Sequence, residues 1–260
     1  MKKAFIYDAI RSPRTKAKDS GGLHELTPTA LLAQLHNTLI DRTHLDPHRL
    51  SEVILGCVTQ YGEQAANIAK TSALLAGWPP EVAGLTINRF CSSSIDAVAL
   101  AAMKINAGQS SALVAGGVEM MSRVPLLADG ARVFADHKFG VSHQVLLMGA
   151  GADLIATRVG ASREDCDEIA FLSHQRALAA QTEKRFSSIV PIKTSVGEIL
   201  EDECVRASLT RERLAGMPAA FAELGAEGSD DVQLAVFEDL GAISHVHTAA
   251  NSPAMCDAAA

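Results

Sequence analysis

Cys91 is the residue whose type and position in this sequence most clearly favour chemistry. It follows a β-rich run at residues 85–88, and a helical pattern begins at Ser92. A thiol at the start of a helix faces backbone N–H groups without intrahelical partners and the positive end of the helix dipole, which together favour the thiolate. The thiolate is the nucleophile, and the same N–H groups can hold the oxyanion formed when it attacks a carbonyl. We therefore predict Cys91 as a nucleophile with its own backbone N–H as an oxyanion donor; the alternative is a structural cysteine at a strand end.

Other candidate groups favour structure over chemistry. The remaining cysteines, at positions 57, 166, 204 and 256, form no CxxC pair and are interpreted as structural. His245 and His247 lie two apart on a predicted strand and therefore point to one face. A metal site would need a third ligand that we cannot place, so no metal is predicted. The Gly116-Gly117 pair lacks the spacing of a dinucleotide-binding fingerprint.

A strand–helix–strand unit positions Cys91. After the strand at 85–88, apolar residues recur at helical spacing from Ser92 to Gly108, and residues 112–115 form the next strand. This order is a βαβ crossover, which implies parallel strands in a sheet covered by helices. Upstream, we predict strands at residues 4–7 and 53–58, a helix that begins at Pro28 with the Thr27 hydroxyl as its cap, and a second helix from residue 67.

The pattern changes after residue 119. Residues 120–148 have loop character, and the string 162–165 (SRED) is typical of a capping box that opens a helix reaching Gln181. A β-like run at 243–248 is predicted to return to the core. The expected organisation is therefore an α/β core at 1–119, an inserted loop domain at 120–242 and a return strand within 243–260.

Composition excludes several classes of protein. The 260 residues carry 23 basic and 30 acidic side chains, a net charge of −7, and 48% are hydrophobic, which excludes a disordered chain. The excess of acidic over basic side chains and the absence of a basic cluster argue against nucleic-acid binding. Charged or polar residues interrupt every apolar stretch, so neither a membrane span nor a signal peptide is predicted. We expect a reducing, cytoplasmic location.

The strings around Cys91 and along the chain resemble the thiolase family (acetyl-CoA acyltransferases). The resemblance rests on strings that occur in the family's order: residues 9–13 (AIRSP), 88–93 (NRFCSS), 116–122 (GGVEMMS), 148–149 (MG), 202–206 (DECVR), 218–221 (PAAF) and 248–252 (TAANS). It implies the N-terminal half of the thiolase fold, a mixed and mostly parallel sheet with helices on both faces, plus an inserted loop domain that covers substrate and CoA.

The resemblance also implies a reaction. Thiolases cleave a 3-oxoacyl-CoA with CoA, or condense two acyl-CoA molecules in reverse, and Cys91 would carry the acyl group as a thioester. Coenzyme A is then a substrate, and no other cofactor is expected. By their positions in the family's strings or in the predicted loop, five residues are expected to contact substrate or CoA: His143, Met148, Arg206, Ala249 and Ser252.

The family's second half is not found in this sequence. That half supplies a histidine in a GHPxG string and a cysteine in a CxG string, which act as base and acid. The sequence ends at Ala260, within what resembles the family's DGAAA segment. The resemblance therefore implies either a split enzyme, in which a second polypeptide supplies these residues, or a fragment. In a split enzyme we expect homodimerisation through the N-terminal core and a heterotetramer.

Departures from the family's strings leave alternatives open. Ser94, Ala250 and Ala258 replace glycines of the family, and Pro253 stands where many relatives have a serine near the pantetheine of CoA. Loss of glycine is costly where the backbone is left-handed or must touch a ligand. The alternatives are a non-catalytic thiolase-like scaffold or CoA-binding subunit, and a condensing relative of the ketoacyl or hydroxymethylglutaryl synthase type.

Overall fold

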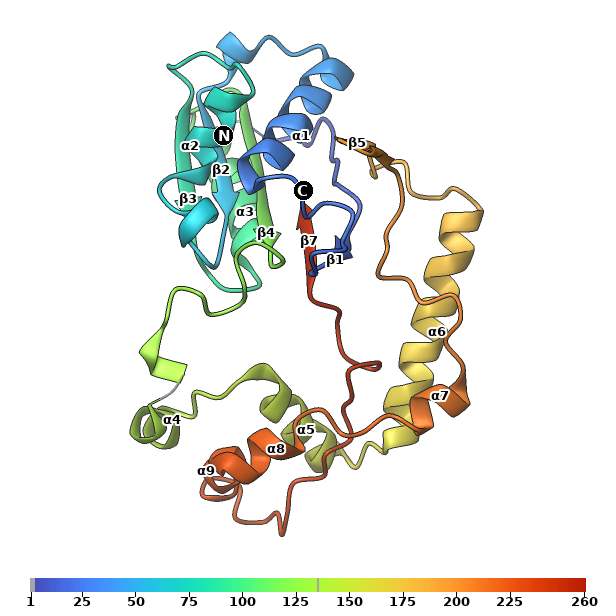
Figure 1. The fold of residues 1–260 in the computed structure, drawn as a ribbon. Coiled ribbons are helices and arrows are strands. Elements are labelled where there is room, and N and C mark those ends of the chain that lie inside the picture. Colours follow the sequence, from blue (N-terminus) through green and yellow to red (C-terminus); the bar gives the residue numbers. More distant parts are fainter. Residues whose placement is uncertain (1–2, 135) are drawn as a thin grey trace. The chain divides into compact units, whose positions relative to one another are not determined.

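The computed structural model describes residues 3–134 and 136–260, which form two compact units (Figure 1). The first, here called the sheet unit, comprises Met1–Asp129, Lys184–Cys204 and Met255–Ala260. The second, the helical unit, comprises Gly130–Glu183 and Val205–Ala254. The chain thus passes from one unit to the other at four points. Residues 184–204, expected within the inserted loop domain, belong with the sheet, as do residues 255–260, which lie in the segment expected to return to the core.

The sheet unit is built on a mixed five-stranded sheet in the order β1-β7-β4-β2-β3. β2 is parallel to both β3 and β4, whereas β7 runs antiparallel to β4 and β1. A mixed, mostly parallel sheet was the prediction, and it is confirmed. The strands are β1 (Thr15–Lys16), β2 (Glu52–Gly56), β3 (Ala83–Ile87), β4 (Leu113–Met120) and β7 (Cys256–Ala259), with a separate hairpin of β5 (Ile192–Thr194) and β6 (Gly197–Ile199).

Helices cover both faces of this sheet, as predicted. The helices are α1 (Pro28–Thr43), α2 (Ile68–Leu75) and α3 (Ser93–Asn106), with short 3-10 turns at Pro47–Arg49 and Gly62–Gln64. Side chains alternate across β2, so that Val53 and Leu55 join α1 and α2 in the larger core while Ile54 packs against α3. Thr27 caps α1 by accepting the Ala30 N–H at 3.2 Å, as its sequence predicts.

The helical unit contains α4 (His137–His143), α5 (Met148–Val159), α6 (Arg163–Thr182), α7 (Arg211–Ala215), α8 (Ala222–Leu224) and α9 (Asp230–Leu234), with a 3-10 turn at Arg132–Phe134 and a π-helical turn at Gly225–Ser229. The predicted capping box opens α6: Ser162 and Asp165 each accept the backbone N–H of the other. The expectation of an irregular segment at 120–148 was wrong in part, since α4 lies within it.

Two predicted strands do not form. Residues 4–7 join no strand of the described chain, and Phe5, Ile6 and Tyr7 are 73, 79 and 93% exposed. Pairing with β7 involves residues beyond this segment, including Ser12, whose N–H donates to the Ala259 carbonyl at 2.9 Å, and β1.

The predicted return strand at 243–248 is also incorrect, because β7, at Cys256–Ala259, makes the return instead. The reason is a contact from α5. The buried Asp153 carboxylate accepts the Val246 and His247 N–H groups, each at 3.1 Å, which a sheet ladder would otherwise use. No helix within residues 3–134 and 136–260 is long and apolar enough to cross a membrane.

Candidate active site

Two glycines on adjacent strands, one at the end of β2 and one within β4, bring the first turn of α3 onto the sheet. Gly56 of β2 and Gly117 of β4 are paired in register. A Cβ on Gly56 would lie 2.6 Å from backbone atoms of Ser93 and Ser94, and one on Gly117 would lie 2.0 Å from Ser94 Oγ. Neither position can therefore carry a side chain while α3 keeps its place. The close approach fixes where the segment before α3, including Cys91, must lie.

A tight turn between β3 and α3 presents Cys91. Phe90 has a φ of 47°, in the left-handed region that non-glycine residues seldom adopt. Its N–H donates to Asn88 Oδ1 at 2.8 Å, and its carbonyl accepts from Ser93 Oγ at 2.6 Å. Ser93 Oγ also accepts the Arg89 N–H at 2.8 Å. These side chains hold the strained turn, and Cys91 follows it at the strand-to-helix junction, where the sequence placed it.

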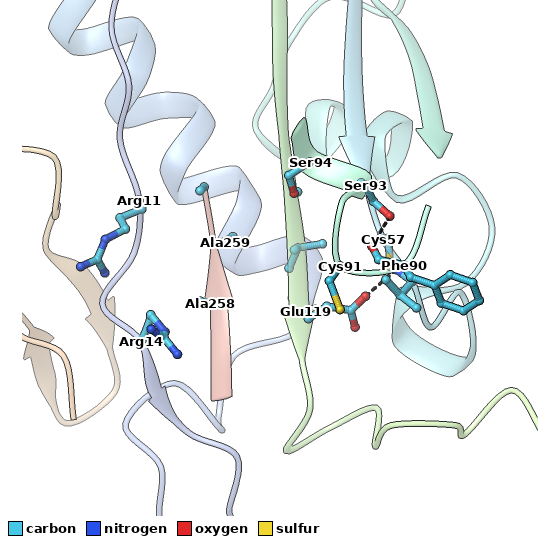
Figure 2. A pocket seen from close by; sticks show the side chains of 15 residues that line it. Arg11, Arg14, Cys57, Phe90, Cys91, Ser93, Ser94, Glu119, Ala258 and Ala259 are labelled. Carbon is cyan, nitrogen blue, oxygen red and sulfur yellow. Dashed lines mark hydrogen bonds between the residues drawn. The ribbon is translucent and has the colours of Figure 1, made fainter. Parts of the chain in front are cut away.

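Cys91 is exposed and lines a pocket of about 270 Å³ in the sheet unit (Figure 2). The pocket is also lined by the ends of β2 and β4, by Ser93 and Ser94, by Ala258–Ala260 and by Arg11 and Arg14. Small residues line much of this space, so the Cys91 thiol is open to a reactant. Such access is a requirement for a nucleophilic thiol.

Glu119 is the acidic side chain of the pocket. Its Oε1 accepts the backbone N–H groups of Val58 and Thr59, at 2.5 and 3.3 Å, and its Oε2 accepts from the Gln64 amide at 2.9 Å. Gln64 is fully buried and its Oε1 in turn accepts the Met120 N–H at 2.8 Å. This network ties the loop after β2 to β4, on the side of the pocket where Cys91 lies (Figure 2).

Two arginines lie on the other side of β7 (Figure 2). Arg11 forms a bidentate pair with Asp202, with both N···O distances 2.7 Å, and the Arg14 backbone N–H donates to the same carboxylate at 2.7 Å. Burial alone would raise the pKa of Asp202, but these donors hold the pKa below its usual value. Glu203 accepts the Lys16 and Gly22 N–H groups. The 202–203 pair thus fastens the loop that carries both arginines.

The other cysteines differ from Cys91 in their surroundings. Burial and the nearby Glu119 charge raise the pKa of Cys57 to about 12, which keeps that thiol neutral. Burial also raises the pKa of Cys166 and of Cys204. All five cysteines are free, and Cys91 is the exposed one.

His245 and His247 share one partner in the helical unit. Their Nδ1 atoms lie 2.9 and 2.7 Å from the two oxygens of buried Asp153, and His247 Nε2 lies 4.0 Å from Cys166 Sγ. Burial alone would lower the pKa of His245, but hydrogen bonds to Asp153 and Asp230 raise it above the usual value. Among the described residues, no group of three or more His, Cys, Asp or Glu side chains is placed to hold a metal ion.

The residues predicted to contact CoA all belong to the helical unit. Arg206 Nη2 donates to the Ala249 carbonyl at 3.2 Å, so these two lie together. Met148, 64% exposed, begins α5, and Ser252 follows a turn in which the Thr248 N–H donates to Asn251 Oδ1 at 2.7 Å. His143 lies at the exposed end of α4 and stacks on Phe139, rather than in a loop as expected.

Two of the family's strings meet in this unit. A Cβ on Gly149, of the MG string, would lie 2.3 Å from the ring of Phe221, of the PAF string. The ring therefore packs directly on the backbone of α5, which is why this position requires glycine.

The replaced glycines introduce no left-handed strain. Ser94, Ala250 and Ala258 are absent from the described non-glycine residues with positive φ. Ser94 fills the space against Gly117, and Ala250 is buried in a cluster with Leu209 and Leu214. These positions therefore accept a side chain without a conformational cost.

Sequence reasoning missed two residues of the pocket, Glu119 and Arg14. Glu119 alternates with Leu113 and Ala115, which pack against α3, so strand periodicity could have placed it on the face of Cys91. No periodicity in the sequence could have placed Arg14 in the pocket, because its position depends on the pairing of β1 with a strand far along the chain.

Fold and site together define an α/β protein with an exposed thiol at a strand–turn–helix junction. The model of the thiolase N-terminal domain family matches residues 4–231. The chain is 37% identical over 232 residues to a 3-ketoacyl-CoA thiolase of Shewanella frigidimarina (strain NCIMB 400), covering 85% of this chain and 58% of that protein. It is 40% identical over 238 residues to a beta-ketoadipyl-CoA thiolase of Acinetobacter baylyi (strain ATCC 33305 / BD413 / ADP1), covering 83% of this chain and 59% of that protein.

The comparison with solved structures agrees with these sequence matches. The crystal structure of the Bacillus anthracis acetyl-CoA acetyltransferase matches with a TM-score of 0.79 and 32% identity, covering 100% of this chain and 64% of that one. The chain therefore belongs to the thiolase family, with the fold of its N-terminal half, and spans somewhat more than half the length of the relatives it matches.

Proposed function

We propose that this chain is the nucleophile-bearing half of a thiolase, an acyl-CoA acyltransferase. The observation that carries the proposal is the exposed Cys91 thiol, held by a strained turn at the start of α3 in an open pocket, in a chain of this family. The relatives it resembles are named as thiolases.

In the cleavage direction, the Cys91 thiolate attacks the C3 carbonyl of a 3-oxoacyl-CoA. The resulting oxyanion collapses and breaks the C2–C3 bond, leaving the acyl group on Sγ, and the departing acetyl-CoA enolate takes a proton at C2. CoA then loses its thiol proton and attacks the thioester, which releases acyl-CoA and restores the thiolate. The Cys91 backbone N–H serves as an oxyanion donor in both steps.

The proton transfers need a base and an acid that we assign to a second polypeptide. None of the described residues that line the pocket is a histidine, and Cys57 is too basic and too buried to act. We expect the partner to carry the GHPxG histidine and the CxG cysteine of the family. In the helical unit, His143, Met148, Arg206, Ala249 and Ser252 would contact CoA, and neither a metal nor a further cofactor is required.

Open surfaces of the sheet unit support a partner. Along β4, residues 113–116 pair with β2 on one side, while β7 pairs with β4 only from Gly117 onward among the described residues. Phe5, Ile6 and Tyr7, which precede the edge strand β1 in the sequence, are also exposed. Unpaired strand edges with exposed apolar side chains are normally covered by another segment.

A second open surface supports homodimerisation, because β3 is an edge strand and α3 exposes Ile95 and Met103, at 73 and 59%. A heterotetramer in the cytoplasm is the expected assembly.

The test is purification of the complex from its own cells through a tag on this chain, with native mass spectrometry. A stoichiometric second polypeptide carrying the histidine and cysteine strings, and acetoacetyl-CoA cleavage that Cys91→Ala abolishes, would support the proposal. A chain that purifies alone, with a Cys91 that CoA does not protect from alkylation, would favour a thiolase-like scaffold instead. Condensation without thiolytic cleavage would favour the ketoacyl or hydroxymethylglutaryl synthase type.

A further inference from the structure

A second thiol, a histidine and a buried carboxylate contact one another in series within the helical unit. His247 Nδ1 lies 2.7 Å from Asp153 Oδ1, and His247 Nε2 lies 4.0 Å from Cys166 Sγ. The three side chains come from α5, from α6 and from the segment between α9 and β7. A nucleophile, an imidazole base and an orienting carboxylate follow one another in this way at sites of nucleophilic attack, where they are recognised by their geometry.

Asp153 determines which ring nitrogen of His247 faces the thiol. The Asp153 side chain is fully buried, and its Oδ1 also accepts the backbone N–H groups of Val246 and His247, each at 3.1 Å. Since a carboxylate only accepts hydrogen bonds, the neutral imidazole must carry its hydrogen on Nδ1. The Nε2 atom, which is the one next to Cys166, is then without hydrogen and can accept the thiol proton.

The surroundings of Cys166 make such a base necessary. Burial raises the pKa of this thiol, and neighbouring charges add to the effect or oppose it. Three carboxylates raise this pKa and one guanidinium lowers it: Asp165, Asp167, Asp153 and Arg163. The thiol is therefore protonated at neutral pH, whereas the thiolate is the nucleophile. Reaction at Cys166 thus depends on transfer of its proton to His247. The separation of 4.0 Å is long for this transfer, but such pairs are commonly looser without a reactant than with one.

The same surroundings favour a small and uncharged reactant. Cys166 and His247 are half-buried, and the histidine side chain is 19% exposed, so a small molecule reaches the thiol more readily than a bulky one. The carboxylates around Cys166 repel an anion. Peroxides meet both conditions, and their O–O bond breaks more easily when the departing oxygen receives a proton. A histidine that has just taken the thiol proton can supply it.

We propose that Cys166 is a peroxide-reactive thiol and that His247 moves the proton in this reaction. His247 Nε2 takes the thiol proton as the sulfur attacks one peroxide oxygen. The S–O bond forms, the O–O bond breaks, and the proton passes from Nε2 to the departing oxygen. The thiol is oxidised to a sulfenic acid, and the peroxide is reduced to water or an alcohol. The inference is independent of the acyl transfer proposed for Cys91, because none of these three side chains lines the pocket of that thiol.

The first experiment measures the pH dependence of alkylation in the full chain. The reagent is iodoacetamide, a small neutral electrophile, and peptide mass spectrometry follows each cysteine. Cys204 is an internal comparison, because it is half-buried, burial also raises its pKa, and no histidine is among the groups that shift that pKa. A thiol without a base reacts about tenfold more slowly for each pH unit below its pKa. With His247 as base, the Cys166 rate should be nearly constant from about pH 7.5 to 8.5, where a histidine of ordinary pKa is neutral, while the Cys204 rate rises.

His247→Gln tests the base, and His245→Gln is its matched control. Both histidine rings contact the Asp153 carboxylate through Nδ1, at 2.7 and 2.9 Å, but the contact with Cys166 belongs to His247. We expect His247→Gln to lower the Cys166 rate at pH 7 at least about tenfold and to restore the steep pH dependence, since general bases contribute about a hundredfold or more at well-built sites. His245→Gln should leave the rate nearly unchanged.

Three results would overturn the assignment of His247. They are a steep profile for Cys166 in the wild type, a rate in His247→Gln that equals or exceeds the wild-type rate, and an equal loss of rate in His245→Gln. The first needs no variant, so the test does not depend on the folding of either one.

The second experiment uses hydrogen peroxide together with dimedone, which labels sulfenic acids. We expect a dimedone adduct at Cys166 in the wild type, formed faster than at Cys204, and a strongly reduced yield in His247→Gln. No adduct at Cys166, whatever forms at the other cysteines, would refute the peroxide reaction. Because neither readout involves an acyl group, failure of the thiolase proposal would leave both results unchanged.

Discussion

Gly56→Ala is expected to displace the first turn of α3 and, with it, the Cys91 thiol. The added Cβ would lie 2.6 Å from the Ser93 carbonyl carbon, 2.6 Å from Ser93 Cβ and 2.6 Å from the Ser94 nitrogen. Two of these atoms are backbone, so no side-chain rotation can relieve the contact. Since carbon atoms settle about 3.5–4.0 Å apart, α3 or β2 must move by about 1 Å.

The magnitude follows from overpacking. Adding a methyl group to a well-packed interior without space costs about 1–3 kcal/mol, and the contact here involves backbone on both sides, which favours the upper half of that range. For a domain of this size, about 2–4 °C in Tm accompanies each kcal/mol, so we expect a Tm lower by about 4–12 °C. The rate of Cys91 alkylation should change in the same variant, because the turn before α3 moves with it.

The assay pairs thermal unfolding with timed iodoacetamide labelling of Cys91. The control is Gly151→Ala in α5, where a Cβ meets nothing within 4 Å and the helix gains a better helix former. We expect that control to keep or raise Tm and to leave labelling unchanged. Gly56→Ala with a Tm and a labelling rate equal to those of the wild type would refute the close approach as the device that positions Cys91.

Further predictions concern protonation and thiol reactivity. His36 is 3% exposed, contacts Trp78, and has a pKa lowered to about 4 by burial, so folding disfavours its protonation. Stability should therefore fall as pH drops from about 6.5 towards 4, by up to about 3 kcal/mol, and His36→Gln should flatten that slope in urea titrations. The pKa of His245 is raised in the fold, so its contribution is full below about pH 6.5 and is lost as pH rises through the folded pKa. His245→Gln should consequently destabilise the protein more at pH 6 than at pH 9. Equal losses of stability at the two pH values would contradict the ion pairs of His245 with Asp153 and Asp230. Asp153→Asn, which replaces a buried carboxylate oxygen that the backbone and both histidine rings contact, should cost about 1–3 kcal/mol in chemical denaturation. Finally, Cys91 should be alkylated before Cys57, whose pKa is about 12, and peptide mapping that finds Cys57 labelled first would contradict the assigned burial.

Local patterns predicted the surroundings of Cys91 well. The strand before it, the helix after it and the strand beyond form a βαβ unit whose periodicities of 2 and 3.6 are readable from a short window. The capping residues Thr27 and Ser162 were also found, because a cap depends on the next three residues alone.

The failures involve contacts between distant segments. Residues 243–248 alternate like a strand, yet a buried carboxylate on α5 takes their N–H groups. Residues 4–7 have strand composition, but the described chain offers them no pairing partner. Arg14 reaches the pocket only through the pairing of β1 with β7, which no local pattern encodes.

The position of β7 between β1 and β4 also sets the order in which the molecule can be built. The Ala259 N–H donates to Ser12 Oγ across 247 residues of sequence, and within the described residues β7 is the one strand beside β1 in the sheet. The β4-β2-β3 part joins segments made early, but the edge strand β1, which directly follows Arg14, cannot dock until β7 has left the ribosome. Closing so long a loop is slow relative to local pairing. During synthesis the thiol side of the pocket is thus assembled first and its cationic side last.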